Sequence, residues 1–204
     1  MSYCLTVMDV TSPTHAFGEA ELAVLDATRD CVERFGFERV TMDDICTAAK
    51  VSRATVYRMF PGGRDVLFEA VRVRSLSDFF TVLRAHVEGA DSLEEVLVRC
   101  ITISHAELVA DQHLATMLAT APGDTLGDLT VSGVSRIVRV AAAFISPLLD
   151  PFVARDEAEE IVELVCRLVI STYLAPSNIL DFSNEESVRR MVRNYLVLPI
   201  SAHH

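Results

Sequence analysis

The stretch that decides the fold is Thr41-Met-Asp-Asp-Ile-Cys-Thr-Ala-Ala-Lys50-Val-Ser-Arg-Ala-Thr-Val-Tyr-Arg-Met-Phe60. It opens with a Ser/Thr-x-x-acid pattern from Thr41 to Asp44, which is typical of a helix amino terminus. Lys50 and Val51 predict a tight turn, and Ser52 predicts the cap of a second helix. Small and apolar side chains would pack the two helices together: Ile45, Ala49, Val51 and Val56.

Polar residues lie on the outer face of the second predicted helix: Ser52, Arg53, Thr55, Tyr57 and Arg58. A helix that enters the major groove of DNA, about 12 Å wide, has to donate hydrogen bonds to bases and phosphates from such a face. The stretch is therefore typical of a DNA-binding helix–turn–helix. Because the same geometry occurs in proteins that bind only protein, an all-helical protein–protein interaction module remains the alternative.

The charge of the chain supports DNA binding only locally. With 18 Lys and Arg against 29 Asp and Glu, the net charge is −11, which argues against a chain that coats nucleic acid along its whole length. Residues 50–74 are different, since they carry two acids, Asp65 and Glu69, and six cations: Lys50, Arg53, Arg58, Arg64, Arg72 and Arg74. This basic segment coincides with the helix–turn–helix pattern, which favours nucleic acid as its partner.

Helical periodicity extends over most of the 204 residues, and alternating strand patterns are missing from the sequence. An apolar stripe predicts a helix from Glu19 to Gly36, and a long helix is expected from Arg64 to about His86. Further helices are predicted at about 91–110, 112–120, 125–149, 156–175 and 184–197, the last capped by the pattern Ser183-x-x-Glu186. We therefore expect an all-α fold of about nine helices. Its expected parts are a flexible tail (1–17), a helix–turn–helix domain (18–63) and a larger helical domain (64–204).

Residues 18–72 resemble the amino-terminal domain of TetR-family transcriptional regulators. The run from Val40 to Pro61 is similar to the family pattern of Thr, then Ile-Ala, then Gly-Val-Ser-x-x-Thr-Leu-Tyr-x-x-Phe, preceded by an aromatic-Gly pair, here Phe35-Gly36. Two departures stand out. Lys50 occupies the position of the turn glycine, and the segment before Arg64 is one residue longer than the usual Pro-x-Lys.

The resemblance implies a homodimeric regulator, usually a repressor, that binds a palindromic double-stranded operator and is released by a small-molecule effector. By position, it implies these DNA-binding residues: Thr41, Lys50, Ser52, Arg53, Thr55, Tyr57, Arg58 and Arg64. Thr41 would cap its helix and hold a phosphate, Tyr57 would contact the backbone, and Arg53 would reach base edges. Arg64, displaced by the inserted residue, would meet the DNA backbone.

The resemblance also places an effector pocket and a dimer interface in the larger domain. For the pocket we expect Phe79, Leu83, His86, Ile101, His105, Met117, Val138 and Phe144, although these residues are also consistent with a solid core. The preponderance of apolar side chains favours an apolar effector. For a four-helix dimer interface we expect Leu164, Leu168, Val188, Met191, Val192 and Tyr195.

Enzyme activity, metal binding and membrane insertion are not expected. Cys100 and His105 are five residues apart, which puts them about 140° from one helical face. No nucleophile elbow, phosphate loop or H-E-x-x-H is present, and the five scattered cysteines fit neither a disulfide framework nor a zinc site. We therefore expect no catalytic residue, cofactor or metal. Without a visible signal peptide or an apolar run long enough for a bilayer, we expect a cytoplasmic protein.

Overall fold

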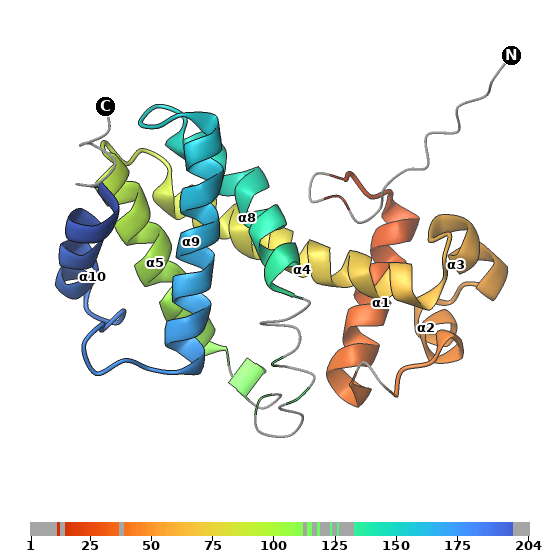
Figure 1. Ribbon diagram of the computed structural model, residues 1–204. Helices are drawn as coiled ribbons and strands as arrows, with labels where there is room; N and C mark the ends of the chain where they lie inside the picture. Colours follow the sequence, from red (N-terminus) through yellow and green to blue (C-terminus); the bar gives the residue numbers. More distant parts are fainter. Residues whose placement is uncertain are drawn as a thin grey trace, which may run out of the picture. The chain divides into compact units, whose positions relative to one another are not determined.

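The computed structural model describes residues 15–36, 39–111 and 133–197, together with the single positions 12, 114, 115, 118, 123 and 126. Within these residues the chain is all-helical and contains no strand, so the predicted fold class is confirmed (Figure 1). The described helices are α1 (Glu19–Phe35), α2 (Met42–Ala49), α3 (Arg53–Met59), α4 (Arg64–Val87), α5 (Leu93–Ala110), α8 (Val134–Leu149), α9 (Arg155–Leu174), α10 (Glu185–Val192) and a π-helical turn, η1 (Arg193–Val197).

The first of two compact units ends at Ser77 and holds α1, α2, α3 and the first part of α4. Its core is built from side chains that are almost completely buried: Val24, Leu25, Ile45, Val56, Phe60 and Leu67. The predicted inner stripe of α1 is correct for Val24, Cys31 and Val32, whereas Phe35 is 54% exposed. The stripe ends before Phe35 because this residue terminates α1 and the chain turns at Gly36, where φ is +79°.

The second unit begins at Asp78, so α4 runs from one unit into the other. The sequence analysis expected the larger domain to start at residue 64, where this helix begins. In the second unit α8 packs against α9, and α5 contacts α9 and α10. The inner faces of these helices carry fully buried side chains: Leu97, Ile101, Val140, Leu149, Val162, Val188 and Val192. Among the helices described, none combines the length and low charge needed to span a bilayer.

Helix α10 starts one residue later than the capping pattern predicts. Asn184, not Ser183, is the capping residue, and its side-chain oxygen accepts a hydrogen bond from the backbone N–H of Ser187 at 3.1 Å. Ser183 instead donates its hydroxyl and backbone N–H to the carboxylate of Asp181. The local pattern contained two neighbouring cap formers, and the Asp181–Ser183 turn takes one of them away from the helix.

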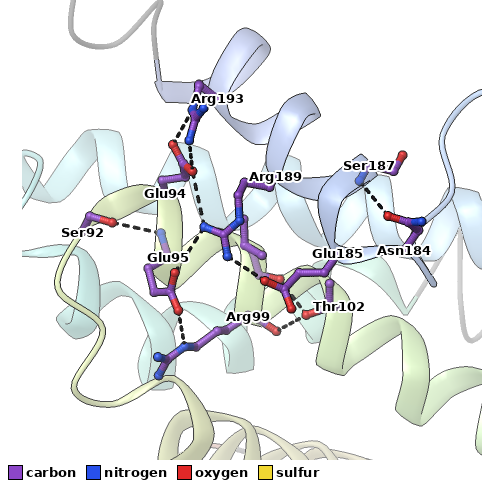
Figure 2. A network of polar contacts seen from close by, with 11 residues as sticks. Ser92, Glu94, Glu95, Arg99, Thr102, Asn184, Glu185, Ser187, Arg189 and Arg193 are labelled. Atoms are coloured by element: carbon purple, nitrogen blue, oxygen red, sulfur yellow. Dashed lines mark hydrogen bonds and ion pairs between the residues drawn. The ribbon is translucent and has the colours of Figure 1, made fainter.

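An ion-pair network joins α10 and η1 to the start of α5 (Figure 2). Arg189 donates to Glu94 at 3.4 Å, to Glu95 at 3.3 Å and to Glu185 at 2.7 Å. Arg193 donates two hydrogen bonds, of 2.8 and 2.9 Å, to the carboxylate of Glu94. Hydrogen bonds from Arg193 and Arg189 hold the pKa of Glu94 below the usual range for a glutamate, and those from Arg99 and Arg189 do the same for Glu95. The network therefore fixes the last helix to the second unit from outside the apolar core.

Candidate nucleic-acid interface

The start of α2 is fixed by a reciprocal cap. The Thr41 hydroxyl oxygen accepts a hydrogen bond from the Asp44 N–H at 3.2 Å, and the Asp44 carboxylate accepts one from the Thr41 N–H at 2.9 Å. The Thr41 hydroxyl also donates to this carboxylate at 2.6 Å. These hydrogen bonds hold the pKa of Asp44 below its ordinary value. The predicted capping pattern is confirmed, and it gives the helix–turn–helix a rigid first element.

The turn between α2 and α3 depends on a left-handed residue. Lys50 has φ +57° and ψ +38°, the only positive φ outside glycine among the residues described. Its backbone N–H points at the carbonyl oxygens of Cys46 and Thr47, which closes the end of α2. A lysine in this conformation costs on the order of 1 kcal/mol relative to glycine, and its side chain is exposed.

The start of α3 is held by Ser52 and Thr55. The Ser52 hydroxyl oxygen accepts a hydrogen bond from the backbone N–H of Thr55 at 3.1 Å, and the two hydroxyl groups lie 2.9 Å apart. Ser52 is therefore the cap that the sequence predicts. Thr55 is half-buried beside Ser52, and the two side chains fix the first turn of α3. That Ser52 and Thr55 also contact DNA remains a prediction.

The outer face of α3 presents Arg53, Tyr57 and Arg58, all three exposed. The Tyr57 ring lies against the turn before α4, since a Cβ atom on Gly63 would come within 2.7 Å of its Cε1 atom. Gly63, with φ +72°, therefore makes room for the ring. This arrangement agrees with a ring that packs while the side chain remains half-exposed.

Several of the six cations in residues 50–74 have partners within the first unit, and Arg53 pairs with Asp43 at 2.9 Å. Arg64 opens α4 as predicted, but its Nε donates to the carbonyl oxygen of Val40 at 3.3 Å, and its guanidinium lies 4.5 Å from the centre of the Phe68 ring. Arg74 pairs with Asp26 of α1 at 2.9 Å. The exposed positive charge of this segment therefore lies mainly on Lys50, Arg53 and Arg58, whose side chains surround the start and outer face of α3.

A groove of about 570 Å³ lies in the second unit between the second half of α5 and the residues that precede α10. Its lining is Thr102, Ile103, His105, Ala106, Val109, Ala110, Phe182, Ser183 and Glu185. Phe182 is buried and meets the His105 ring edge-on, with ring centres 5.9 Å apart. The sequence analysis missed Phe182 because it stands between helices, although the apolar run Ile179-Leu180 just before it was a usable signal.

The structure brings together few of the residues expected at an effector pocket. His105 lines the groove, whereas Leu83 and Ile101 are fully buried core residues. His86 is exposed, and a ring nitrogen lies 2.8 Å from the carbonyl oxygen of Val82 in the preceding turn of its own helix. Three others are half-buried and away from the groove lining: Phe79, Val138 and Phe144. Met117 lies outside the described residues.

The residues expected at a dimer interface fall into two groups. Val188, Met191 and Val192 are buried within the unit, where α10 packs on α5, so they are not available to a second chain. The sequence analysis expected these three residues at the dimer interface. The structure uses them instead to pack α10 onto the core, and the helix has no second apolar face. Leu164 and Tyr195 are exposed at 45% and 70%, and Leu168 is half-buried.

Within the part of the chain that the structure describes, no three His, Cys, Asp or Glu side chains are grouped so that they could hold a metal ion. Cys100 and Cys166 face low-polarity surroundings, and burial raises the pKa of each thiol to about 12. Both are therefore protonated thiols at neutral pH and poor nucleophiles.

Comparison with known proteins agrees with the geometry of the first unit. Residues 24–71 match the family model described as bacterial regulatory proteins, tetR family. The HTH-type transcriptional regulator AlkX of Mycobacterium tuberculosis is 26% identical over 158 residues, 76% of this chain and 74% of that protein. The uncharacterized HTH-type transcriptional regulator Mb2274c of Mycobacterium bovis is 31% identical over 81 residues, 40% of this chain and 41% of the relative.

Two solved structures share the fold. The TetR-family repressor AlkX from Dietzia sp. strain DQ12-45-1b, implicated in biodegradation of n-alkanes, superposes with a TM-score of 0.64 at 22% identity, over 90% of this chain and 98% of that one. The fatty acid degradation regulator FadR from Bacillus halodurans gives 0.51 at 16% identity, over 89% and 98%. Together with the capped helix–turn–helix and its cationic outer face, these findings show that residues 24–71 belong to the tetR family of bacterial regulatory proteins and that the chain is a DNA-binding transcriptional regulator.

Proposed function

We propose that the chain is a homodimeric repressor that binds a palindromic operator and loses affinity for it when an apolar effector binds in the second unit. The DNA-binding part of this proposal rests on how α3 is held in place. Its start is capped by Ser52, its approach is set by the left-handed Lys50, and its outer face presents Arg53 and Arg58. A helix held in this way is suited to enter a major groove as a rigid element.

The groove beside α5 supports the effector part of the proposal. Its volume is within the range of about 300–1,000 Å³ that is usual for small-molecule sites. Ile103, Ala106 and Val109 supply apolar walls, while His105 and Glu185 bring polar groups to the same lining. This combination fits an elongated apolar molecule with one polar end. The first probes are hexadecanoate, which has such a polar end, and hexadecane, which lacks it. They are chosen because the Bacillus halodurans FadR is a fatty acid degradation regulator and the Dietzia AlkX is implicated in n-alkane biodegradation.

The proposed response is a shift between two populated conformations. An effector that binds one conformation better than the other changes operator affinity by the same free-energy difference. Helix α4 begins in the DNA-binding unit and ends in the unit that holds the groove, which provides a covalent connection between the two sites. In a dimer, a small change at this helix alters whether two recognition helices match successive major grooves.

An operator selection tests both parts. The chain is used to select duplexes from a randomised pool, and its affinity for the selected duplex is measured with and without each probe. Ala106→Trp fills the groove from an exposed position of α5, and Glu107→Trp adds the same bulk at the neighbouring exposed position outside the lining. We expect release by a probe to be lost in Ala106→Trp and kept in Glu107→Trp. Release that survives in both variants would exclude this groove as the effector site.

A further inference from the structure

A carboxylate of α2 contacts the arginine that opens α3. The Nε atom of Arg53 lies 2.9 Å from Oδ1 of Asp43, so the two side chains form an ion pair. Both side chains are largely exposed, Arg53 at 57% and Asp43 at 76%, so the pair lies on the surface that α3 would present to DNA. No other polar contact of Arg53 is formed among the residues that the structure describes.

The ion pair is at Nε of Arg53, so the terminal nitrogens of its guanidinium stay available to DNA. A guanidinium has one N–H on Nε and two on each terminal nitrogen. The contact of Asp43 is with Nε, so the four N–H groups of Nη1 and Nη2 remain for another acceptor. Guanine presents two acceptors, N7 and O6, at a spacing that matches a bidentate arginine. The ion pair with Asp43 therefore lies at the side of the guanidinium that an end-on approach to guanine does not require.

Both partners are mounted on fixed backbone. Asp43 is in the first turn of α2, directly beside the Thr41–Asp44 cap, and Arg53 is the first residue of α3, directly after its cap Ser52. The turn between the two helices is closed by the Lys50 and Val51 backbone N–H groups, which bond to carbonyl oxygens at the end of α2. The Arg53 side chain starts from α3, and Asp43 of α2 restrains it near its far end. Both helices belong to the same rigid helix–turn–helix.

The Asp43–Arg53 pair has opposite effects on the affinity for the operator and on the affinity for DNA of arbitrary sequence. An exposed ion pair in water is weak, but its attraction grows when a bound duplex displaces water from the surface. On the selected sequence, Asp43 keeps Arg53 aimed at its base. On an arbitrary sequence, the same carboxylate repels phosphates and holds Arg53 away from them. Both effects widen the difference in affinity between the operator and other DNA.

We propose that Asp43 is a positioning residue that determines DNA sequence specificity by orienting Arg53 toward a guanine. The proposal rests on the DNA-binding function of the chain and on base contact by Arg53. It assigns Asp43 a role that is separate from capping, since the capping carboxylate of α2 is Asp44.

The test measures a ratio of affinities. Wild-type chain selects a duplex from a randomised pool, and dissociation constants are then measured for this duplex and for a scrambled duplex of the same composition. Asp43→Asn removes the charge and weakens the hold on Arg53. The matched control is Asp65→Asn, which removes an exposed first-turn acid from α4 in the same unit. Arg53→Ala and the double variant complete a cycle, and circular dichroism melts verify that every variant is folded.

We expect Asp43→Asn to lower the specificity ratio about fivefold or more, the smaller end of what one bidentate base contact contributes. It should do so by tightening binding to scrambled DNA and weakening binding to the selected duplex. Asp65→Asn should leave the ratio within about twofold of wild type, as a change of net charge alone acts on all DNA alike. In the Arg53→Ala background, Asp43→Asn should lower the ratio no further. Asp43→Glu, which keeps a carboxylate within reach of Nε, should retain most of the wild-type ratio.

Three results would overturn the proposal. An equal change of ratio in Asp43→Asn and Asp65→Asn would mean that only charge matters. A loss of ratio by Asp43→Asn that persists without Arg53 would mean that Asp43 acts by another route. A rise in affinity for the selected duplex with an undiminished ratio would mean that Asp43 merely competes with DNA for Arg53. If the wild-type chain selects no duplex at all, the DNA-binding function itself fails, which is a distinct outcome.

Discussion

Arg64 reaches back from the first turn of α4 to the chain segment that precedes α2, where its Nε donates to the carbonyl oxygen of Val40 at 3.3 Å. Its guanidinium also lies over the Phe68 ring. The cation that sequence comparison assigns to the DNA backbone is thus part of the packing of its own unit. A contact with phosphate would use a side chain that is already oriented, which lowers the entropy lost on binding.

Arg64→Ala should weaken binding to the selected operator and to scrambled DNA by similar factors, because phosphates carry no sequence information. The slope of log affinity against log salt should fall by about one unit for each half-site. The same variant should lose roughly 1 kcal/mol of stability, since a hydrogen bond and a cation–π contact are removed. Titrations at several salt concentrations and urea unfolding provide the two measurements. Loss of affinity for the operator alone would place Arg64 at a base instead.

Lys50 is the position at which function and stability are expected to oppose each other. Lys50→Gly should raise the free energy of unfolding by about 1 kcal/mol, as glycine adopts φ +57° without strain. It should also weaken binding to all DNA if the ammonium contacts a phosphate. Lys50→Asn is the control, because asparagine tolerates the left-handed region and carries no charge. Undiminished affinity in both variants would remove Lys50 from the DNA-contact set.

The stability of the first unit should depend on pH through Asp44. Its pKa in the folded chain lies below the ordinary value of about 3.9, because Thr41 donates hydrogen bonds to the charged carboxylate. The contribution is therefore fully present above about pH 4 and is lost as the pH falls through the folded-state value. Asp44→Ala should be less stable than wild type at pH 7, and the difference should shrink as the pH falls below 4. A difference that is constant with pH would show that the charge of Asp44 has no role in the cap.

These elements also show what a local pattern can and cannot predict. The caps at Thr41 and Ser52 and the turn at Lys50 depend on residues within four positions of one another, and the sequence predicts all of them. The partner of Arg64, the groove beside Phe182 and the inward face of α10 depend on which helices pack together in the folded unit. Val188 and Val192 are periodic in a way that fits a core or an interface equally well, so periodicity alone does not distinguish the two.

The ion-pair network of Figure 2 gives a prediction for the second unit. Arg189→Ala should lower its stability by about 1 kcal/mol, the upper part of the range for partly exposed pairs, because three carboxylates lose one shared partner. The pKa values of Glu94 and Glu95 are lowered in the folded chain, so their contribution is present at neutral pH and is lost as the pH falls below about 4.3. Thermal melts of wild type and variant should converge at low pH and at high salt. Melts that differ equally under all these conditions would point to lost packing of the Arg189 side chain instead.

The dimer interface can be tested with residues on the outside of the unit. Leu164 of α9 and Tyr195 of η1 are large apolar side chains that remain exposed in the single chain, as expected for positions that a second chain covers. Leu164→Asp should shift the chain toward the monomer in light scattering, because a carboxylate in an apolar interface loses its hydration. The melting midpoint of the monomeric chain should change little, and operator affinity should fall because two half-sites are no longer bound together.

Val192→Asp is the informative counterpart, since the Val192 side chain is fully buried against α5. This substitution should cost several kcal/mol and unfold the second unit, whatever the oligomeric state. Leu164→Asp that remains dimeric, with Tyr195→Asp dimeric as well, would exclude this face as the interface. A folded, monomeric Val192→Asp would instead show that α10 leaves α5 to pair with a second chain, contrary to the packing described above.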